Sequence, residues 1–181
     1  MSRGLGDVYK RQRLDWVVSE VAKLHPAANF HLVLAGQASA AEFAQFERQA
    51  RGMLGDRVHL FQNLDSSRMI SLYRAADIFV HAALREPFGI VFLEAMASGL
   101  PVVAHEFAVT QWIIGDGGRA VDMTEAGRLA EVLESWGEDR DLRHSIGARA
   151  RLRATEVFSE EQIIPLYQQM YQRIAAGTAL L

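Results

Sequence analysis

The sequence predicts an α/β protein built on a doubly wound parallel sheet with helices on both faces. Segments with helical apolar spacing alternate along the chain with short apolar runs of strand length. This alternation is typical of parallel sheets whose strands are joined by helices. The chain has 181 residues, of which 50% are apolar, so it can bury one good core. We therefore expect one compact domain.

The first half of the chain predicts three strands and the helices that precede them. The expected elements are, in order, a helix that ends at His25-Pro26, a strand over 30–36, a helix over 40–51, a strand over 57–61, a helix capped by Asp65 or Ser66, and a strand over 77–83. Gly36 stops the first of these strands.

The second half predicts two further strands and a helical end. The expected elements are a helix over 90–98 with a glycine stop at Gly99, a strand over 101–104, a short helix or turn at 112–114, an edge strand over 119–123, and helices over 125–136, 139–156 and 160–174. Ser159 and Gln162 predict a capping box for the last helix, and Pro165 is expected to kink it unless the first turn slips.

Composition excludes several classes of function. Nineteen basic and 22 acidic residues give a net charge of −3 without a long run of either sign, so we expect no nucleic-acid surface and no polybasic anchor. The absence of cysteine excludes a disulfide scaffold, and the six histidines do not have metal-ligand spacing, so we expect no metal. No apolar run reaches the roughly 20 residues of a membrane span, and no secretory signal opens the chain. We expect a cytoplasmic protein.

The first twelve residues, MSRGLGDVYKRQ, have no usable apolar periodicity and join abruptly to the periodic segment at Arg13. They look like translated sequencing-adaptor read-through. We therefore interpret 1–12 as a non-native leader and 13–181 as the domain.

The segment from Glu86 to Glu94 carries the chemistry. Two carboxylates lie eight residues apart, one ahead of a predicted helix and one within it, and PFGIV between them places backbone amides at the helix start. Free amides and the helix dipole at such a terminus can hold a diphosphate. Glu94 can accept both hydroxyls of a ribose, and Glu86 can reach a sugar beyond the phosphates. The segment follows a strand, and ligands bind at the carboxyl ends of parallel strands.

These residues also have plain structural interpretations. Glu86 can be a solvent-facing loop residue, Pro87 a turn former, and Glu94 part of the polar face of an amphipathic helix. Spacing alone leaves the two interpretations open.

The stretch EPFGIVFLEAMASGLPVVA resembles the signature of family-4 retaining glycosyltransferases of the GT-B fold. The order of RLDWVV, LVLAG, RVHLF, YRAADIFV and FSEEQIIPLYQQMYQRI agrees with that family too. The chain from Arg13 onward resembles its carboxy-terminal, Rossmann-like domain, which binds the nucleotide sugar. The resemblance implies a fold truncated at its amino end.

The resemblance implies a role for eight residues. Glu86 resembles the glutamate that contacts the transferred sugar and is proposed to stabilise positive charge at its anomeric carbon, and Glu94 resembles the ribose-binding carboxylate. The other implied donor-binding residues are Phe88, Gly89, Ile90, Val91, Gly36 and Leu64. For Phe88 and Val91 we expect core side chains with functional amides. A strand-ending turn at Gly36 is equally compatible with the sequence, and a core position is the commoner interpretation of Leu64.

Several positions depart from the family pattern. Its Gly-Arg strand is missing, and the position of its lysine falls on Gln12. Ala82-Ala83 stand where Pro-Ser is common, and Gln62 replaces a frequent glycine. The sugar-facing loop, which often has paired glycines, reads HEFAVTQW. His105 or Glu106 can contribute to a site there, although a histidine beside a strand end is more often structural.

The implied reaction transfers a hexose from a nucleoside diphosphate sugar to an unknown acceptor with retention, and without a cofactor or metal. The resemblance assigns acceptor binding to an amino-terminal domain that this chain lacks, and through which the enzyme could be peripheral to a membrane. A GT-B-type epimerase or phosphorylase and a non-catalytic sugar-nucleotide-binding or interaction module remain alternatives. A receiver-like signalling domain shares the sheet but would need a clustered acidic pocket at its first strand.

Overall fold

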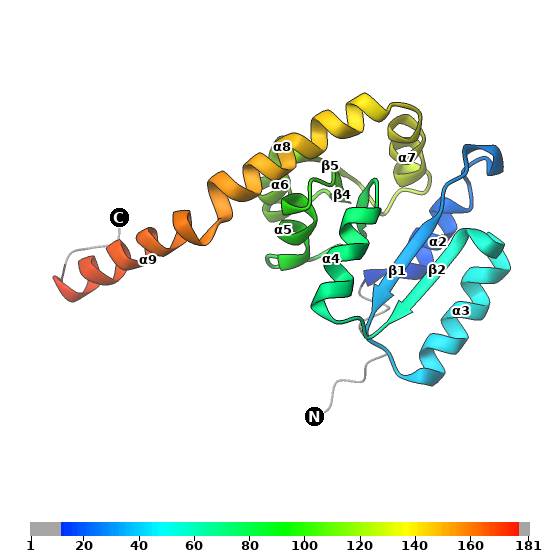
Figure 1. Ribbon diagram of the computed structural model, residues 1–181, viewed down its shortest axis with the longest axis horizontal. Helices are drawn as coiled ribbons and strands as arrows, with labels where there is room; N and C mark the ends of the chain where they lie inside the picture. Colours follow the sequence, from blue (N-terminus) through cyan, green and yellow to red (C-terminus); the bar gives the residue numbers. More distant parts are fainter. Residues whose placement is uncertain (1–11, 178–181) are drawn as a thin grey trace.

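The computed structural model describes residues 12–177, in which parallel strands are flanked by helices (Figure 1). The predicted leader 1–12 lies outside the described residues except for Gln12. The elements are α2 (Leu14–Val21), β1 (Leu32–Gly36), α3 (Ala40–Leu54), β2 (Val58–Gln62), α4 (Ser66–Ala75), β3 (Phe79–His81), α5 (Ile90–Ala97), β4 (Val102–His105), α6 (Ala108–Ile114), β5 (Gly118–Val121), α7 (Arg128–Glu138), α8 (Arg140–Phe158) and α9 (Glu160–Ala175).

All strand pairs within this part of the chain are parallel, which confirms the predicted α/β class. One sheet pairs β1 with β2, with Leu34 opposite Leu60. The other has the order β3-β4-β5, with Val103 between Val80 and Arg119. The described strands therefore form two sheets where the sequence predicts one.

A cavity separates the two sheets, and it lies between the edges of β1 and β3. One edge of β1 is taken by β2 and one edge of β3 by β4, so the other edges of β1 and β3 are the ones left toward the cavity. Consecutive residues of both strands line it, which means that strand edges, and not single faces, are presented. A right-handed crossover through α2 to β1 would begin from a strand at this position. Within residues 12–177 no strand lies there. The family's Gly-Arg strand would precede Gln12, which places this expectation outside the described residues.

Two apolar clusters hold the elements together. The first joins α2, α3, β1, β2 and α7, and contains the buried Val18, Leu54 and Trp136. The second packs α5, β4, α6 and α8 around Phe92 and Ile113. Each such side chain stabilises the fold by about 1.5–3 kcal/mol when it leaves water. The second cluster fixes α5 against β4 and so positions the segment that carries the two glutamates.

Helix starts follow the predicted capping residues in one case and depart from them in another. Asp65 caps α4, since its side chain accepts the Arg68 amide at 2.9 Å. The predicted capping box of Ser159 with Gln162 is wrong: the Ser159 side chain forms no cap hydrogen bond. The Gln162 amide instead donates to the Ser159 carbonyl at 3.0 Å, which satisfies that donor without the hydroxyl. α9 continues through Pro165 as one helix.

Helix α7 begins at Arg128 and not at 125 as predicted, because Gly127 has a positive φ of 96°. A residue from α2 caps this helix. The buried Glu20 accepts the Gly127 amide at 2.9 and 3.0 Å and the Ala130 amide at 3.4 Å. A carboxylate at this position satisfies free amides and complements the helix dipole, so it couples two elements far apart in sequence.

Helices α8 and α9 follow one another along one side of the molecule, and α9 projects away from the sheets (Figure 1). No residue of α9 is buried. The segment between β3 and α5 contacts the end of α8, from which α9 departs, with the ring centroids of Phe88 and Phe158 6.2 Å apart.

Candidate functional site

The loop between β3 and α5 brings Glu86 to the start of a helix. Gly89 is the N-cap of α5 and has a positive φ of 66°, in the left-handed region. A Cβ at Gly89 would lie 2.8 Å from Glu86 Cγ and 2.8 Å from the Phe92 ring. Only glycine allows this backbone and this close approach. The first amides of α5, on Ile90 and Val91, have no acceptor carbonyl within the helix. They follow directly on the loop that contains Glu86.

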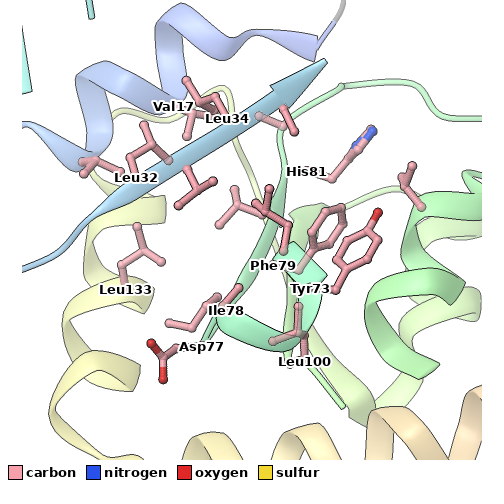
Figure 2. Close-up of a pocket in the computed structure, with 18 of the residues that line it drawn as sticks. Val17, Leu32, Leu34, Tyr73, Asp77, Ile78, Phe79, His81, Leu100 and Leu133 are labelled. Atoms are coloured by element: carbon pink, nitrogen blue, oxygen red, sulfur yellow. The ribbon is translucent and has the colours of Figure 1, made fainter. Parts of the chain in front are cut away.

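A cavity of about 1040 Å³ opens beside this loop, between β1 and β3. Figure 2 shows Leu32 and Leu34 on one side of it and Ile78 and Phe79 on the other. Five of the eight predicted donor-binding residues line this cavity: Glu86, Phe88, Gly89, Ile90 and Val91. The cavity therefore joins the first glutamate to the amino terminus of α5.

The structure does not bring the other three predicted residues to the cavity lining. Glu94 lies one turn into α5 on an exposed surface. Gly36 ends β1, where its carbonyl accepts the Asn63 amide at 3.1 Å. Leu64 is half-buried in the loop between β2 and α4. Their roles in donor binding stay predictions.

Phe88 is not the core side chain that the sequence predicts. Its ring is 40% exposed and not a core residue. It packs edge-on against Phe158 at the end of α8, with the centroids 6.2 Å apart. Pro87 and Phe88 precede the helix and are exposed, whereas the first buried residue of α5 is Phe92. Val91 is half-buried.

His81 is a residue of this site that the sequence reasoning missed. It ends β3, its side chain is 10% exposed, and its Nε2 atom lies 3.8 Å from Glu86 Oε2. Its ring packs edge-on against Phe92 at 4.9 Å, and its buried Nδ1 has no hydrogen-bond partner. Burial lowers the pKa of His81, and the neighbouring Glu86 partly opposes this shift. The sequence signal that could have identified His81 is a histidine at the end of a predicted strand, five residues before Glu86.

Tyr73 is a second missed residue. Its ring is buried on α4, and its hydroxyl donates a hydrogen bond of 2.9 Å to Glu94 Oε2. Figure 2 shows the rings of Tyr73 and Phe79 side by side in the cavity wall, with centroids 5.9 Å apart. Burial, followed by the hydrogen bond to Glu94, raises the pKa of Tyr73 well above its usual range. Tyr73 thus links Glu94 to the cavity that Glu86 lines.

The positions that depart from the family pattern lie in different places. Gln12, at the position of the family's lysine, lines the same cavity as Glu86. His105 Nδ1 accepts the Met123 amide at 3.2 Å, which agrees with a structural histidine. Glu106 lines a separate, smaller cavity of about 270 Å³ beside β5 and α7.

The described residues contain neither a metal-binding cluster nor a membrane-spanning helix. Between residues 12 and 177, no three histidine, aspartate or glutamate side chains are grouped as a metal ion would require. In the same part of the chain, no helix has the length and apolar character needed to cross a membrane.

Comparison with known proteins gives a consistent result. Residues 5–153 match the family described as glycosyl transferases group 1. D-inositol 3-phosphate glycosyltransferase of Corynebacterium kroppenstedtii is 33% identical over 139 residues, which cover 74% of this chain and 31% of that protein. The chain spans between 29% and 42% of the length of the first curated relatives it matches.

Solved structures share the fold. Sucrose-phosphate synthase from Thermosynechococcus elongatus superposes with a TM-score of 0.82 at 27% identity, over 93% of this chain and 44% of that one. The Anabaena protein HepE, solved in complex with UDP-glucose, has a TM-score of 0.75 at 23% identity, over 92% of this chain and 46% of that one.

Proposed function

This chain belongs to the family of glycosyl transferases group 1, and from that premise we propose that residues 13–181 are the donor-binding domain of a retaining hexosyltransferase. The donor is a nucleoside diphosphate sugar. The observation that carries the proposal is the end of the cavity at the loop between β3 and α5, where Glu86 and the first residues of α5 line it together. The fold is also shared with a protein solved with UDP-glucose, which supports this class of donor.

The start of α5 suits a diphosphate. Its free amides and the positive end of the helix dipole favour an anion at this position. Gly89 carries no side chain that would stand between the anion and these amides. The proposed reaction uses no cofactor and no metal, because the amides can stabilise the charge that develops on the leaving phosphate.

In the proposed reaction, the bond between the anomeric carbon and the phosphate oxygen breaks, and a bond to the acceptor hydroxyl forms on the same face. The β-phosphate oxygen takes the acceptor's proton. Glu86, at the cavity wall, stabilises positive charge on the sugar in the oxocarbenium-like transition state, and α5 stabilises the departing diphosphate.

Acceptor binding is assigned to a further, amino-terminal domain of the same enzyme. The part that this chain spans is only 29% to 42% of the length of the curated relatives. Residues 1–181 are therefore expected to bind nucleotide weakly and to transfer no sugar. Measurable sugar transfer by this polypeptide would contradict the assignment of the acceptor site.

Calorimetric titration with UDP, GDP and ADP tests donor binding. We expect Glu94→Ala to weaken binding of the preferred nucleotide by about 1–3 kcal/mol, because the ribose hydroxyls lose their acceptor. Glu134→Ala is the matched control, since Glu134 is also an exposed helical glutamate but lies on α7 and not on α5. Equal affinities for the two variants and the parent would contradict the ribose contact and favour a non-catalytic interaction module.

A further inference from the structure

The hydrogen bond between Tyr73 and Glu94 joins α4 to α5 beside the cavity, whose lining includes Tyr73 but not Glu94. Tyr73 is 7% exposed, whereas Glu94 is exposed on its helix. The hydroxyl donates to Oε2 of the carboxylate at 2.9 Å. Among the residues that the structure describes, no other group donates a hydrogen bond to the Glu94 carboxylate. An otherwise free surface carboxylate is thus held by one buried anchor.

We propose that Tyr73 is a positioning residue that orients Glu94 for a ribose, and that it thereby sets a preference for ribonucleotides over 2′-deoxyribonucleotides. This inference rests on the proposed donor-binding function. Tyr73 acts through Glu94, because its hydroxyl has a single proton and already donates it to Oε2 of Glu94.

The geometry leaves Glu94 capacity for a diol. A carboxylate has two oxygens with about four acceptor positions, and the tyrosine occupies one position on Oε2. Oε1 and the second position on Oε2 remain for two vicinal hydroxyls. The bound tyrosine also keeps the carboxylate plane in one orientation, so less side-chain freedom is lost when a ligand binds.

Tyr73 is itself a rigid anchor. Its ring packs edge-on against Phe79 at 5.9 Å, and tyrosine has only two side-chain torsions to fix. Burial and the neighbouring carboxylate raise the pKa of Tyr73, so the hydroxyl stays a neutral donor at physiological pH. The Tyr73 hydroxyl therefore remains a hydrogen-bond donor throughout the physiological pH range.

Replacing tyrosine by phenylalanine separates positioning from packing, because the ring stays and only the hydroxyl is removed. We would titrate UDP, GDP and ADP, each beside its 2′-deoxy form, into residues 1–181 and into Tyr73→Phe. The parent is expected to prefer the ribonucleotide by about tenfold, the effect of one charge-assisted hydrogen bond. In Tyr73→Phe this preference is expected to fall below about threefold, through weaker ribonucleotide binding with little change for the deoxy form.

Two further variants complete the test. Tyr171→Phe is the matched control, because Tyr171 is 64% exposed on α9, and its selectivity is expected to equal that of the parent. Glu94→Gln changes only an exposed side chain and is expected to keep the fold. It is expected to lose the preference as well, and adding Tyr73→Phe to it is expected to change the ratio no further.

The outcomes distinguish this inference from the function on which it rests. Equal weakening of both nucleotide forms in Tyr73→Phe would mean a role in packing alone and would overturn the inference. An unchanged ratio would overturn it too. Absence of binding of any of the three nucleotides to the parent would overturn the proposed donor site, and the inference with it.

Discussion

At the scale of single residues, the carboxyl end of β3 brings together two groups that can change charge. His81 is nearly buried and lies 3.8 Å from the Glu86 carboxylate across a gap too long for a hydrogen bond. Tyr73 and Glu94 lie on the neighbouring α4 and α5, where the hydroxyl is already bonded. The pKa of His81 is therefore lowered first by burial, and the Glu86 carboxylate opposes this shift.

We predict that stability decreases below pH 6.5 in part because of His81. Burial lowers the pKa of His81 below its ordinary 6.5, so the unfolded chain binds this proton more readily than the folded one. The contribution of neutral His81 is complete above pH 6.5 and is lost as the pH falls through the lowered pKa. Each unit of pKa difference corresponds to about 1.4 kcal/mol.

Urea unfolding of the parent and of His81→Gln between pH 7.5 and 5.0 measures this effect. The free energy of unfolding of His81→Gln is expected to fall less steeply with acidification, since the other titrating groups are common to both proteins. His144→Gln serves as the control, because His144 is an exposed residue of α8 and the substitution is the same. Parallel curves for the parent and His81→Gln would contradict the prediction.

At the scale of elements, α8 approaches the turn between α5 and β4 so closely that it needs a residue without a side chain. A Cβ on Gly147 would lie 2.1 Å from the Gly99 carbonyl oxygen, and one on Gly117 would lie 2.5 Å from Ala150 Cα on the same helix. These contacts are with backbone, which cannot rotate away as a side chain can. The position of α8, and through it that of α9, depends on these two glycines.

We predict opposite effects for two glycine substitutions inside helices. Alanine favours a helix over glycine by up to about 1 kcal/mol, but an overpacked contact costs about 1–3 kcal/mol. Gly147→Ala is therefore expected to destabilise the fold by about 1–2 kcal/mol. Gly52→Ala on α3, where a Cβ meets nothing within 4 Å, is expected to stabilise it by about 0.5–1 kcal/mol.

Chemical denaturation of both variants beside the parent decides the sign. A gain in stability for Gly147→Ala would show that α8 can move from Gly99 at little cost. A loss for Gly52→Ala would mean that the exposed end of α3 is constrained by something besides its helical backbone.

At the scale of the whole molecule, the described sheet is divided between β1 and β3. Strand edges that lie open to another chain are templates for pairing. We predict that residues 1–181 self-associate through these edges, so that the apparent mass rises with concentration. Val33→Lys, which puts a charge on β1 at a cavity-lining position that is 40% exposed, is expected to reduce the association.

Light scattering over a concentration series measures the association. Leu152→Lys adds the same charge on α8, where Leu152 is 55% exposed, and is expected to associate as the parent does. A monodisperse monomer at all concentrations would contradict the prediction, and equal reduction by both lysines would assign the association to charge alone.

Much of the fold follows from local sequence. The strand at 32–36 lies within the predicted 30–36, and α5 begins at Ile90 as predicted. Asp65 caps α4. These features depend on residues within one or two turns of each other, and periodicity and capping chemistry act at that range. The motif from Glu86 to Glu94 also predicted a glutamate next to a helix start, and both line one cavity in the structure.

Only the tertiary structure decided which side chains meet. Tyr73 and Glu94 are 21 residues apart, and Glu20 caps a helix more than 100 residues away. Such contacts depend on how helices pack on a sheet, and no local pattern contains that information. The sequence alone determined the α/β class, the family resemblance and the segment that carries the chemistry. Folding decided the division of the sheet, the cavity and the partners of the two glutamates, because burial and hydrogen bonding are shared between elements that only packing brings together.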